Sequence, residues 1–298
     1  MAYILVTGSE GLIGNKLCIA LEKMGRLVRH FDIRYPKPHE SYGNILDTAC
    51  LQEKVKDCSG IIHLAAVSRV VWGERDPDLC WQTNVVGTKN IIKVAMESSL
   101  KPWIIYASSR EVYGQQRQLP VEIDAGYQPM NIYARSKVEA EKEILQARYS
   151  YLNTAVVRYS SVYGSVGDHA DRVTPAFCRA ATFGTPFKIE GKDNTLDFTH
   201  VEDVVDGTIK LINLLEHKEL LPPIHLTTGI PTTLYQLAVL ASKAAGKELK
   251  LKEMPCRSYD VTRFWGNTHK TSQLLNWQAK IPVATGIYNL VQQFLEGK

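Results

Sequence analysis

Near the start of the chain, Thr7-Gly8-Ser9-Glu10-Gly11-Leu12-Ile13-Gly14 leads from the apolar run Tyr3–Val6 into the amphipathic stretch Leu12–Met24. Glycines in such a loop allow a tight turn, a close approach of the backbone to a pyrophosphate, and close packing of a helix on a strand. The helix that follows offers free N–H groups and the positive end of its dipole to phosphates. The loop therefore predicts a dinucleotide site between a strand and a helix.

The next strand-like run ends at Asp32, where a carboxylate accepts hydrogen bonds from ribose hydroxyls and repels a 2′-phosphate. This position favours NAD over NADP. Arg34 follows closely enough to weaken that preference, because a guanidinium attracts phosphate. One alternative is a glycine turn that binds nothing, but the strand before the loop, the helix after it and Asp32 all agree with NAD.

Strand-like and helix-like stretches alternate through the first half of the chain. The short, nearly all-apolar runs suit a parallel sheet covered on both faces; they are Tyr3–Val6, Leu27–Phe31, Gly60–Leu64, Trp103–Ala107 and Thr154–Arg158. Apolar residues at three- and four-residue spacing predict helices between them, at Leu12–Met24, Leu79–Glu97 and Ile132–Ala147. This alternation predicts a doubly wound α/β sheet.

The second half is less regular and predicts a smaller lobe. Pro, Gly and scattered polar residues occur through residues 161–199 and 226–298. We therefore expect two domains: a NAD-binding domain formed by residues 1–160 plus about 200–225, and a substrate-binding lobe formed by about 161–199 and 226–298.

Composition excludes several classes of protein. The 298 residues are 45% hydrophobic and 22% charged, as in globular proteins, and the net charge of +4 comes without a dense basic run, which argues against nucleic-acid binding. The six cysteines lack zinc or disulfide spacing, so we expect reduced thiols and no metal. With no signal-like or membrane-length apolar segment, we expect a cytoplasmic protein without a membrane partner.

Tyr133 and Lys137 stand four residues apart in a helical pattern, so their side chains share one helix face. A phenol has a pKa near 10, and each unit of depression requires about 1.4 kcal/mol of preferential phenolate stabilisation. A nearby ammonium supplies such stabilisation in a partly desolvated pocket. The phenolate then takes a hydroxyl proton while a hydride passes to NAD. Such a pair is often merely exposed, but its position after the glycine loop favours catalysis.

Ser108 and Ser109 end the strand-like run before Arg110-Glu111-Val112-Tyr113-Gly114. The carboxyl ends of parallel strands face the ligand crevice in doubly wound sheets. A serine hydroxyl there holds a substrate oxygen as its proton leaves. The alternative is a serine that caps the following turn.

The chain resembles the extended short-chain dehydrogenase/reductases, and within them the NAD-dependent nucleotide-sugar epimerase/dehydratase family (UDP-galactose 4-epimerase-like). The resemblance rests on the GxxGxxG spacing of residues 8–14, His63-Leu64-Ala65-Ala66, the string at 108–114, the Tyr133–Lys137 pair and Arg158-Tyr159-Ser160-Ser161-Val162-Tyr163-Gly164. It covers nearly the whole chain. It implies a Rossmann-type doubly wound parallel sheet with a small mixed C-terminal substrate lobe.

The resemblance also implies roles for individual residues. Tyr133 would be the catalytic base, supported by Lys137 and Ser109, with Glu111 as a further catalytic candidate. The implied cofactor contacts are Gly8, Gly11, Leu12, Ile13, Gly14, Asp32, Asn44, Ile45, Leu64, Ala65, Ala66, Ser68, Tyr133, Lys137 and Tyr159. The implied substrate contacts are Ser108, Ser109, Ser161, Arg172 and Arg257, of which Arg257 would grip a diphosphate. Asn84 matches an asparagine with a structural role.

Two departures concern the substrate diphosphate. Leu196 stands where an arginine is usual, and Ser161 stands where an asparagine is usual. Because leucine cannot form the paired hydrogen bonds of an arginine, either Arg257, Arg172 or Lys192 takes over or the substrate lacks a diphosphate.

The residues after Ser109 bear on the reaction. Arg110-Glu111 replaces the Asp–Glu pair of 4,6-dehydratases and the Ser–Glu pair of decarboxylases. The absent aspartate disfavours dehydration, while Glu111 leaves decarboxylation open; alternatively, Arg110 and Glu111 form a solvated ion pair of little consequence.

An epimerase of a nucleotide sugar with a transient 4-keto intermediate requires the fewest additional groups, and it is our first prediction. The alternatives are a 4-ketosugar reductase, a decarboxylase or dehydratase that uses Glu111, a dehydrogenase of a small hydroxy acid, and a dinucleotide-binding protein without catalysis. The resemblance further implies a homodimer whose seam is formed by the helices at Leu79–Glu97 and Ile132–Ala147.

Overall fold

The computed structural model describes residues 2–217 and 219–297. Two compact units make up the chain. The first comprises Met1–Gly114, Asp124–Tyr159 and Val205–Ile224, and the second comprises Gln115–Ile123, Ser160–Val204 and His225–Lys298. The short segment 115–123, which the sequence places in the first domain, therefore clusters with the second unit. The assignment of NAD and substrate to separate domains stays a prediction.

A six-stranded sheet has the order β2-β1-β3-β4-β5-β9. Its strands are β1 (Tyr3–Thr7), β2 (Val28–Phe31), β3 (Cys58–His63), β4 (Trp103–Ser109), β5 (Thr154–Tyr159) and β9 (Ile224–Leu226). The pairs β1/β2, β1/β3, β3/β4 and β4/β5 are parallel. The strand order reverses beside β1, which confirms the predicted Rossmann-type doubly wound α/β fold.

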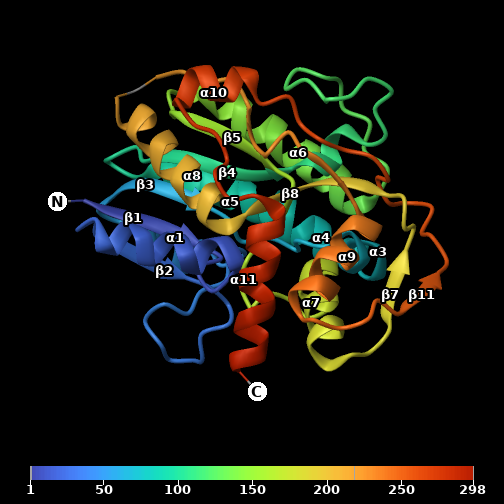
Figure 1. Cartoon of the computed structure of the whole chain (residues 1–298). Helices are drawn as coiled ribbons and strands as arrows, with labels where there is room; N and C mark the ends of the chain where they lie inside the picture. Colours follow the sequence, from blue (N-terminus) through green and yellow to red (C-terminus); the bar gives the residue numbers. More distant parts are fainter. Residues whose placement is uncertain (1, 218, 298) are drawn as a thin grey trace. The chain divides into compact units, whose positions relative to one another are not determined.

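Helices cover both faces of this sheet, as Figure 1 shows with α1 and α8 in front of the strands and α5 and α6 behind them. The helical segments are α1 (Leu12–Lys23), α2 (Thr48–Val55), α3 (Val70–Arg75), α4 (Pro77–Trp81), the π-helical turn η1 (Gln82–Val86), α5 (Gly87–Glu97), the short η2 (Arg110–Tyr113), α6 (Ile132–Gln146), η3 (Ala147–Ser150) and α8 (Val201–Glu216). Side chains from α2, α5 and α6 share one buried core with Leu5, Ile61, Ile104 and Val156 of the strands.

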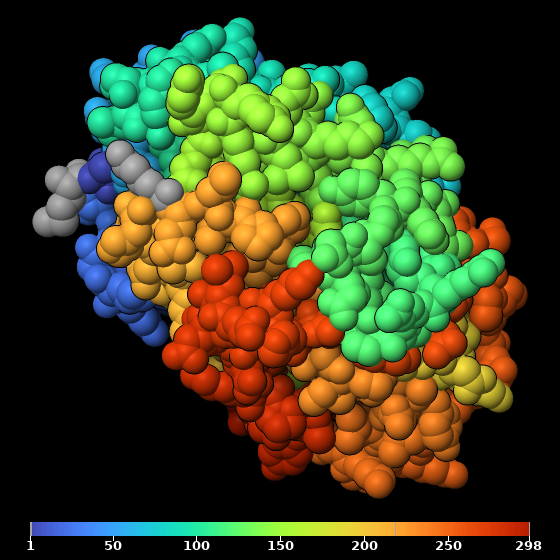
Figure 2. All heavy atoms as spheres, turned by 90° about the horizontal axis from the view of Figure 1, so that it is seen from above, coloured from blue at the N-terminus to red at the C-terminus, as the bar shows by residue number. Residues whose placement is uncertain are grey.

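The carboxyl ends and the amino ends of the strands lie on opposite sides of the sheet and carry different residues. Register pairs Thr7 with His63 and Ser109 with Tyr159, so the predicted site residues gather at the carboxyl ends of the strands. The segments before β4 and β5 lie at the amino ends of the strands, where the Ile104 N–H donates to the Asn153 carbonyl at 2.9 Å. Figure 2 shows them side by side at the surface, near residue 100 in teal-green and near residue 150 in lime.

The second unit has its own small sheets and core. Strands β6 (Ser161–Tyr163), β8 (Thr195–His200) and β10 (Pro231–Thr233) form a mixed sheet, while β7 (Phe187–Glu190) and β11 (Leu251–Met254) form a parallel pair. Its helices are α7 (Val173–Phe183), α9 (Leu234–Ala244), α10 (His269–Leu275) and α11 (Val283–Glu296). Aromatic and aliphatic side chains of α7, α9 and α11 form its core with Phe187 and Phe198.

Two further observations concern the whole described chain. None of the helices within residues 2–217 and 219–297 is both long and apolar enough to cross a membrane. All six cysteines carry free thiols.

The glycine loop is fixed by close backbone contacts. Gly8 has a φ of +72°, and a Cβ added to it would lie 2.7 Å from the Ala65 nitrogen. A Cβ on Gly14 would lie 2.1 Å from the Gly8 carbonyl oxygen. Only glycine therefore lets the first turn of α1 approach the end of β1, as the sequence predicts.

We expect Gly14→Ala to destabilise the protein by about 3 kcal/mol, at the upper end of the range for overpacking, because the backbone has no room to yield. Urea unfolding measures this change. Gly126→Ala is the matched control, since an added Cβ there meets nothing within 4 Å. Equal stability of the two variants would show that the loop relaxes without cost.

Candidate active site

Asp32 joins the glycine loop to the end of β2. Its carboxylate accepts from the Glu10 N–H at 3.0 Å and from the Arg34 N–H at 2.9 Å. The Arg34 guanidinium lies 3.4 Å from the same carboxylate, and Asp32 is buried. Arg34 is therefore held by Asp32 in this structure.

The residues around the loop fit a dinucleotide. No side chain fills the turn at Gly8, and Gly11 and Gly14 open α1 directly beyond it. Leu12 and Ile13 form the first residues of α1, so their N–H groups belong to the free N-terminus of a helix. This cradle agrees with the pyrophosphate of NAD.

The loop after β3 is held from both sides. The Leu64 N–H donates to the Thr7 carbonyl at 3.1 Å, and the Ala65 N–H donates to Thr7 Oγ1 at 3.3 Å. Asn84 binds both backbone groups of Val67, at 2.8 and 3.1 Å, and donates to Ser136 Oγ at 2.9 Å. The placement favours the structural role predicted for Asn84, which fixes the predicted cofactor segment that includes Ala66 and Ser68.

The remaining predicted cofactor residues lie in turns and strand ends. Asn44 is exposed and its side chain accepts from the Leu46 N–H at 2.9 Å, while Ile45 is buried and its carbonyl accepts from Asn90 at 3.0 Å. Tyr159 ends β5 and lies 3.4 Å from Thr208 Oγ1. Burial raises the pKa of Tyr159 to about 12, so its phenol stays neutral.

Tyr133 and Lys137 are buried on the first turns of α6, as the helical pattern predicts. Lys137 Nζ lies 5.9 Å from the centre of the Tyr133 ring and donates to the Ala107 carbonyl at 2.7 Å. It also lies 4.9 Å from the centre of the Tyr106 ring. Burial lowers the pKa of Lys137 to about 8, although the Cys80 and Glu141 side chains favour its charged form.

Ser109 is partly buried at the end of β4, and its Oγ accepts from the Glu111 N–H at 3.2 Å. It therefore caps the short helix η2, which is the alternative that the sequence leaves open. Capping uses only an acceptor of the hydroxyl, so its donor stays available for a substrate oxygen.

Ser108 points into a buried network. Its hydroxyl donates to Glu141, whose carboxylate lies 2.6 Å from Arg158 Nη2. Arg158 also donates to the Tyr113 hydroxyl at 2.6 Å; burial lowers the pKa of Arg158, but its contacts with Glu141 and Tyr113 together raise that pKa above its usual value. This placement favours a structural role for Ser108 over the predicted substrate contact.

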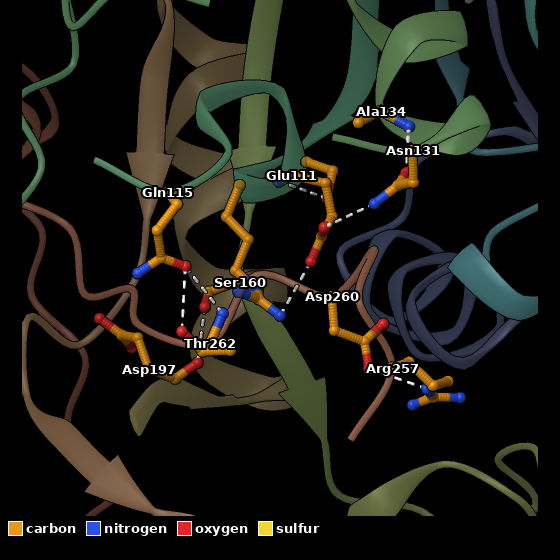
Figure 3. Close-up of polar contacts among 11 residues, drawn as sticks. Glu111, Gln115, Asn131, Ala134, Ser160, Asp197, Arg257, Asp260 and Thr262 are labelled. Atoms are coloured by element: carbon orange, nitrogen blue, oxygen red, sulfur yellow. Dashed lines mark hydrogen bonds and ion pairs between the residues drawn. The ribbon is translucent and has the colours of Figure 1, made fainter. Parts of the chain in front are cut away.

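Arg110 and Glu111 form an ion pair at 2.9 Å with side chains only 12% and 7% exposed. The alternative of a solvated pair is therefore wrong, because both groups are largely desolvated. Glu111 also accepts from Asn131 Nδ2 at 3.2 Å, as Figure 3 shows.

The predicted phosphate ligands of the second unit have carboxylate partners. Arg257 contacts Asp260 and Glu190, each at 2.8 Å, and its side chain is 35% exposed. Arg172, at the start of α7, lies 3.4 Å from Asp168.

The strands of this unit hold the two positions that depart from the family. Ser161 is the first residue of β6 and pairs with Phe198 of β8. Leu196 is buried in the apolar core, so it cannot replace the usual arginine. Its neighbour Asp197 has a structural role, since it accepts from the Thr228 and Gly229 N–H groups at 2.9 and 2.8 Å, and Ser160 donates to its carbonyl (Figure 3).

Sequence reasoning missed several residues that shape the site. Glu141 lies four residues after Lys137, so the same helical spacing could have placed it on the Lys137 face. Asn131 directly precedes the amphipathic helix α6, at the position where a capping residue stands. Glu74 has no local signal, because its contact with α6 joins segments far apart in the sequence.

The NAD dependent epimerase/dehydratase family matches residues 4–221 of the chain. The chain is 28% identical over 324 residues to a UDP-glucose 4-epimerase of Cyamopsis tetragonoloba, with 94% of this chain and 91% of the relative covered. Its fold is similar to the UDP-glucose 4-epimerase of Thermotoga maritima solved with UDP-glucose (TM-score 0.90, 24% identity, 99% of each chain). It is also similar to DesIV, a dTDP-glucose 4,6-dehydratase of Streptomyces venezuelae solved with NAD (TM-score 0.89, 20% identity, 99% and 97% covered).

These matches define the class of protein. The chain belongs to the NAD-dependent epimerase/dehydratase family. It is an enzyme of this kind and uses NAD as its cofactor.

The alkaline limb of activity follows from Lys137. Its ammonium is present below a pKa of about 8 and is lost above it, so we expect kcat/KM to fall as the pH rises through about 8. Lys137→Arg keeps a positive charge to higher pH. In that variant the limb should move upwards, whatever the absolute loss of rate. A limb that remains near 8 would assign it to another group.

Cofactor preference follows from the Asp32–Arg34 pair. Asp32→Ala removes the carboxylate that would accept from the ribose hydroxyls, together with the acceptor of the Glu10 N–H, and it releases Arg34. We therefore expect the Kd for NAD to rise about tenfold and the difference in affinity between NAD and NADP to narrow. Arg34→Ala is the paired variant, and it should retain the preference for NAD. Calorimetric titration with both dinucleotides measures this, and an unchanged preference in Asp32→Ala would contradict it.

Proposed function

We propose that the protein is an epimerase that inverts a hydroxyl-bearing carbon of a nucleotide-activated sugar through a transient 4-keto intermediate. One observation carries the proposal. Tyr133 and Lys137 are buried together on α6, and Lys137 is anchored to Ala107, two residues before Ser109 on β4. These are the groups that a reversible oxidation of a hydroxyl requires.

Each residue has a distinct part in the reaction. NAD, which the glycine loop and Asp32 would hold, would supply a reversible hydride acceptor for the carbinol carbon. Tyr133 takes the hydroxyl proton through its phenolic oxygen and gives it back at the end. The Lys137 ammonium stabilises the phenolate, and the Ser109 hydroxyl donates to the substrate oxygen as negative charge develops on it.

The surroundings of Glu111 favour epimerisation over elimination or decarboxylation. Those reactions need a group that gains and loses a proton near the sugar ring. Glu111 instead has both carboxylate oxygens occupied within the protein, one by Arg110 at 2.9 Å and the other by Asn131 Nδ2 at 3.2 Å, so neither oxygen is offered to the sugar ring. A 4-ketosugar reductase would use Tyr133, Lys137 and Ser109 in one direction only.

The substrate class rests on the relatives and on Arg257. The curated relatives include UDP-glucose 4-epimerases and a UDP-glucuronate 4-epimerase. In this chain Arg257 is the guanidinium proposed to bind the diphosphate, and it would exchange Glu190 for the phosphate oxygens.

We also propose a homodimer and retain the prediction of a cytoplasmic location. A groove on the first unit, lined by Lys89, Ile92, Met96 and Glu143, runs between α5 and α6. Lys93 and Glu97 line it as well, and this combination of two apolar side chains with charges of both signs supports pairing of these helices with a second copy.

We expect the protein with NAD to convert a nucleotide sugar into a product of equal mass and inverted stereochemistry, without net NADH. Mass spectrometry, NMR and absorbance over a panel of nucleotide sugars measure this. Tyr133→Phe should lower kcat by about 10³-fold and leave the affinity for NAD intact, since only proton transfer is lost. Loss of water or carbon dioxide, or net consumption of NADH, would assign a different reaction. Wild-type rates in Tyr133→Phe would exclude it as the base.

A further inference from the structure

The first turn of α6, which carries Tyr133, is held by a carboxylate from α3. Glu74 Oε1 accepts from the Ile132 N–H at 2.8 Å. The neighbouring Gly73 is buried against Tyr133, because an added Cβ would lie 3.2 Å from the Tyr133 nitrogen and 3.3 Å from its Cβ. The end of α3 therefore fixes the backbone just before Tyr133.

A second carboxylate holds the backbone just after Tyr133. Asn131 caps α6, and its Oδ1 accepts from the Ala134 N–H at 2.7 Å. The Nδ2 of the same amide donates to Glu111 Oε2 at 3.2 Å, and Figure 3 shows Asn131 between Ala134 and Glu111. Glu111 thus fixes the orientation of the amide that caps the helix.

Both contacts act where a helix is least stable. The first N–H groups of a helix have no partner within it, and helix ends fray unless a side chain satisfies them. Tyr133 is the second residue of α6, so its position depends on these contacts more than on the helical hydrogen bonds. A displacement of about 1 Å at a reacting group costs about 10²-fold in rate.

We propose that Glu74 and Glu111 are positioning residues for Tyr133: Glu74 holds the Ile132 N–H directly, and Glu111 holds the Ala134 N–H through Asn131. The inference rests on the proposed role of Tyr133 as the base. It gives Glu111 a function other than proton transfer, since Arg110 and Asn131 each contact one of its carboxylate oxygens.

Matched variants separate positioning from acid–base chemistry. Glu74→Ala and Glu111→Ala remove the acceptor, and we expect each to lower kcat by about 10²-fold while KM changes less than about twofold. Glu74→Gln and Glu111→Gln keep a carbonyl acceptor, and we expect each to recover kcat to within about fivefold of the parent enzyme. Asn131→Ala removes both the cap of Ala134 and the amide link to Glu111, so it should resemble Glu111→Ala.

Glu139→Ala is the control, because Glu139 lies on α6 and pairs only with Lys142 among the described residues. Rates of the Ala variants equal to that of the control would overturn the proposal. A Glu111→Gln enzyme as slow as Glu111→Ala would overturn it for Glu111 and assign proton transfer to that carboxylate. Likewise, a Glu74→Gln enzyme as slow as Glu74→Ala would overturn it for Glu74.

Amide hydrogen exchange of the NAD complex tests the same contacts without a substrate. We expect exchange to quicken about tenfold at Ile132 in Glu74→Ala and at Ala134 in Glu111→Ala, with Val138 unchanged. If no sugar is converted by the parent enzyme, the proposed function fails, yet this exchange pattern still supports the contacts that hold Tyr133. Unchanged exchange at both amides would overturn the inference, even if the enzyme is an epimerase.

Discussion

The site depends on one buried contact, the hydrogen bond of 2.7 Å from Lys137 Nζ to the Ala107 carbonyl. An ammonium taken out of water must find partners, and the strand end provides one. The contact fixes α6 against β4. Because Tyr133 lies one helical turn before Lys137, and Ser109 lies two residues after Ala107, the same contact brings Tyr133 and Ser109 to one end of the sheet. Glu141, one turn further along α6, fixes the same helix to β5 through Arg158. The position of the proposed base is therefore a property of helix–sheet packing and not of a flexible loop.

Local sequence patterns predicted the sheet, the glycine loop and the shared face of Tyr133 and Lys137. They did not predict that the helix expected at Leu79–Glu97 contains a π-helical turn at Gln82–Val86. Asn84 within that turn binds Val67 and Ser136, which lie far from it in the sequence. Other features were missed for the same reason, because they also depend on tertiary packing: the partner of Ser108, the burial of Arg110 with Glu111, and the contact of Glu74 with α6. Periodicity reports which face of an element is buried, but not which distant polar group meets it there.

The second unit departs most from the expectations drawn from the family resemblance. Leu196 belongs to an apolar core, and Arg257 and Arg172 each contact at least one carboxylate. A phosphate ligand would have to displace these internal partners, and the free energy of that exchange reduces the gain from binding. If Arg257 binds the substrate diphosphate, as proposed, the affinity for the substrate depends on the difference in free energy between two ion pairs. An arginine without an internal carboxylate partner would bind phosphate without this loss of free energy.

The Arg158–Glu141 pair constrains how this sequence can evolve. Both side chains are almost fully buried, with 4% and 0% exposure. Loss of either partner alone leaves an uncompensated charge and costs about 3–5 kcal/mol, whereas replacement of both by apolar residues is often neutral. Natural domains have only about 5–15 kcal/mol of stability in total. A single substitution at either position therefore removes a large part of the stability of the fold, so we expect the two residues to change together. Ser108 donates to the same carboxylate, so the effect of a substitution at Ser108 also depends on whether this ion pair is present.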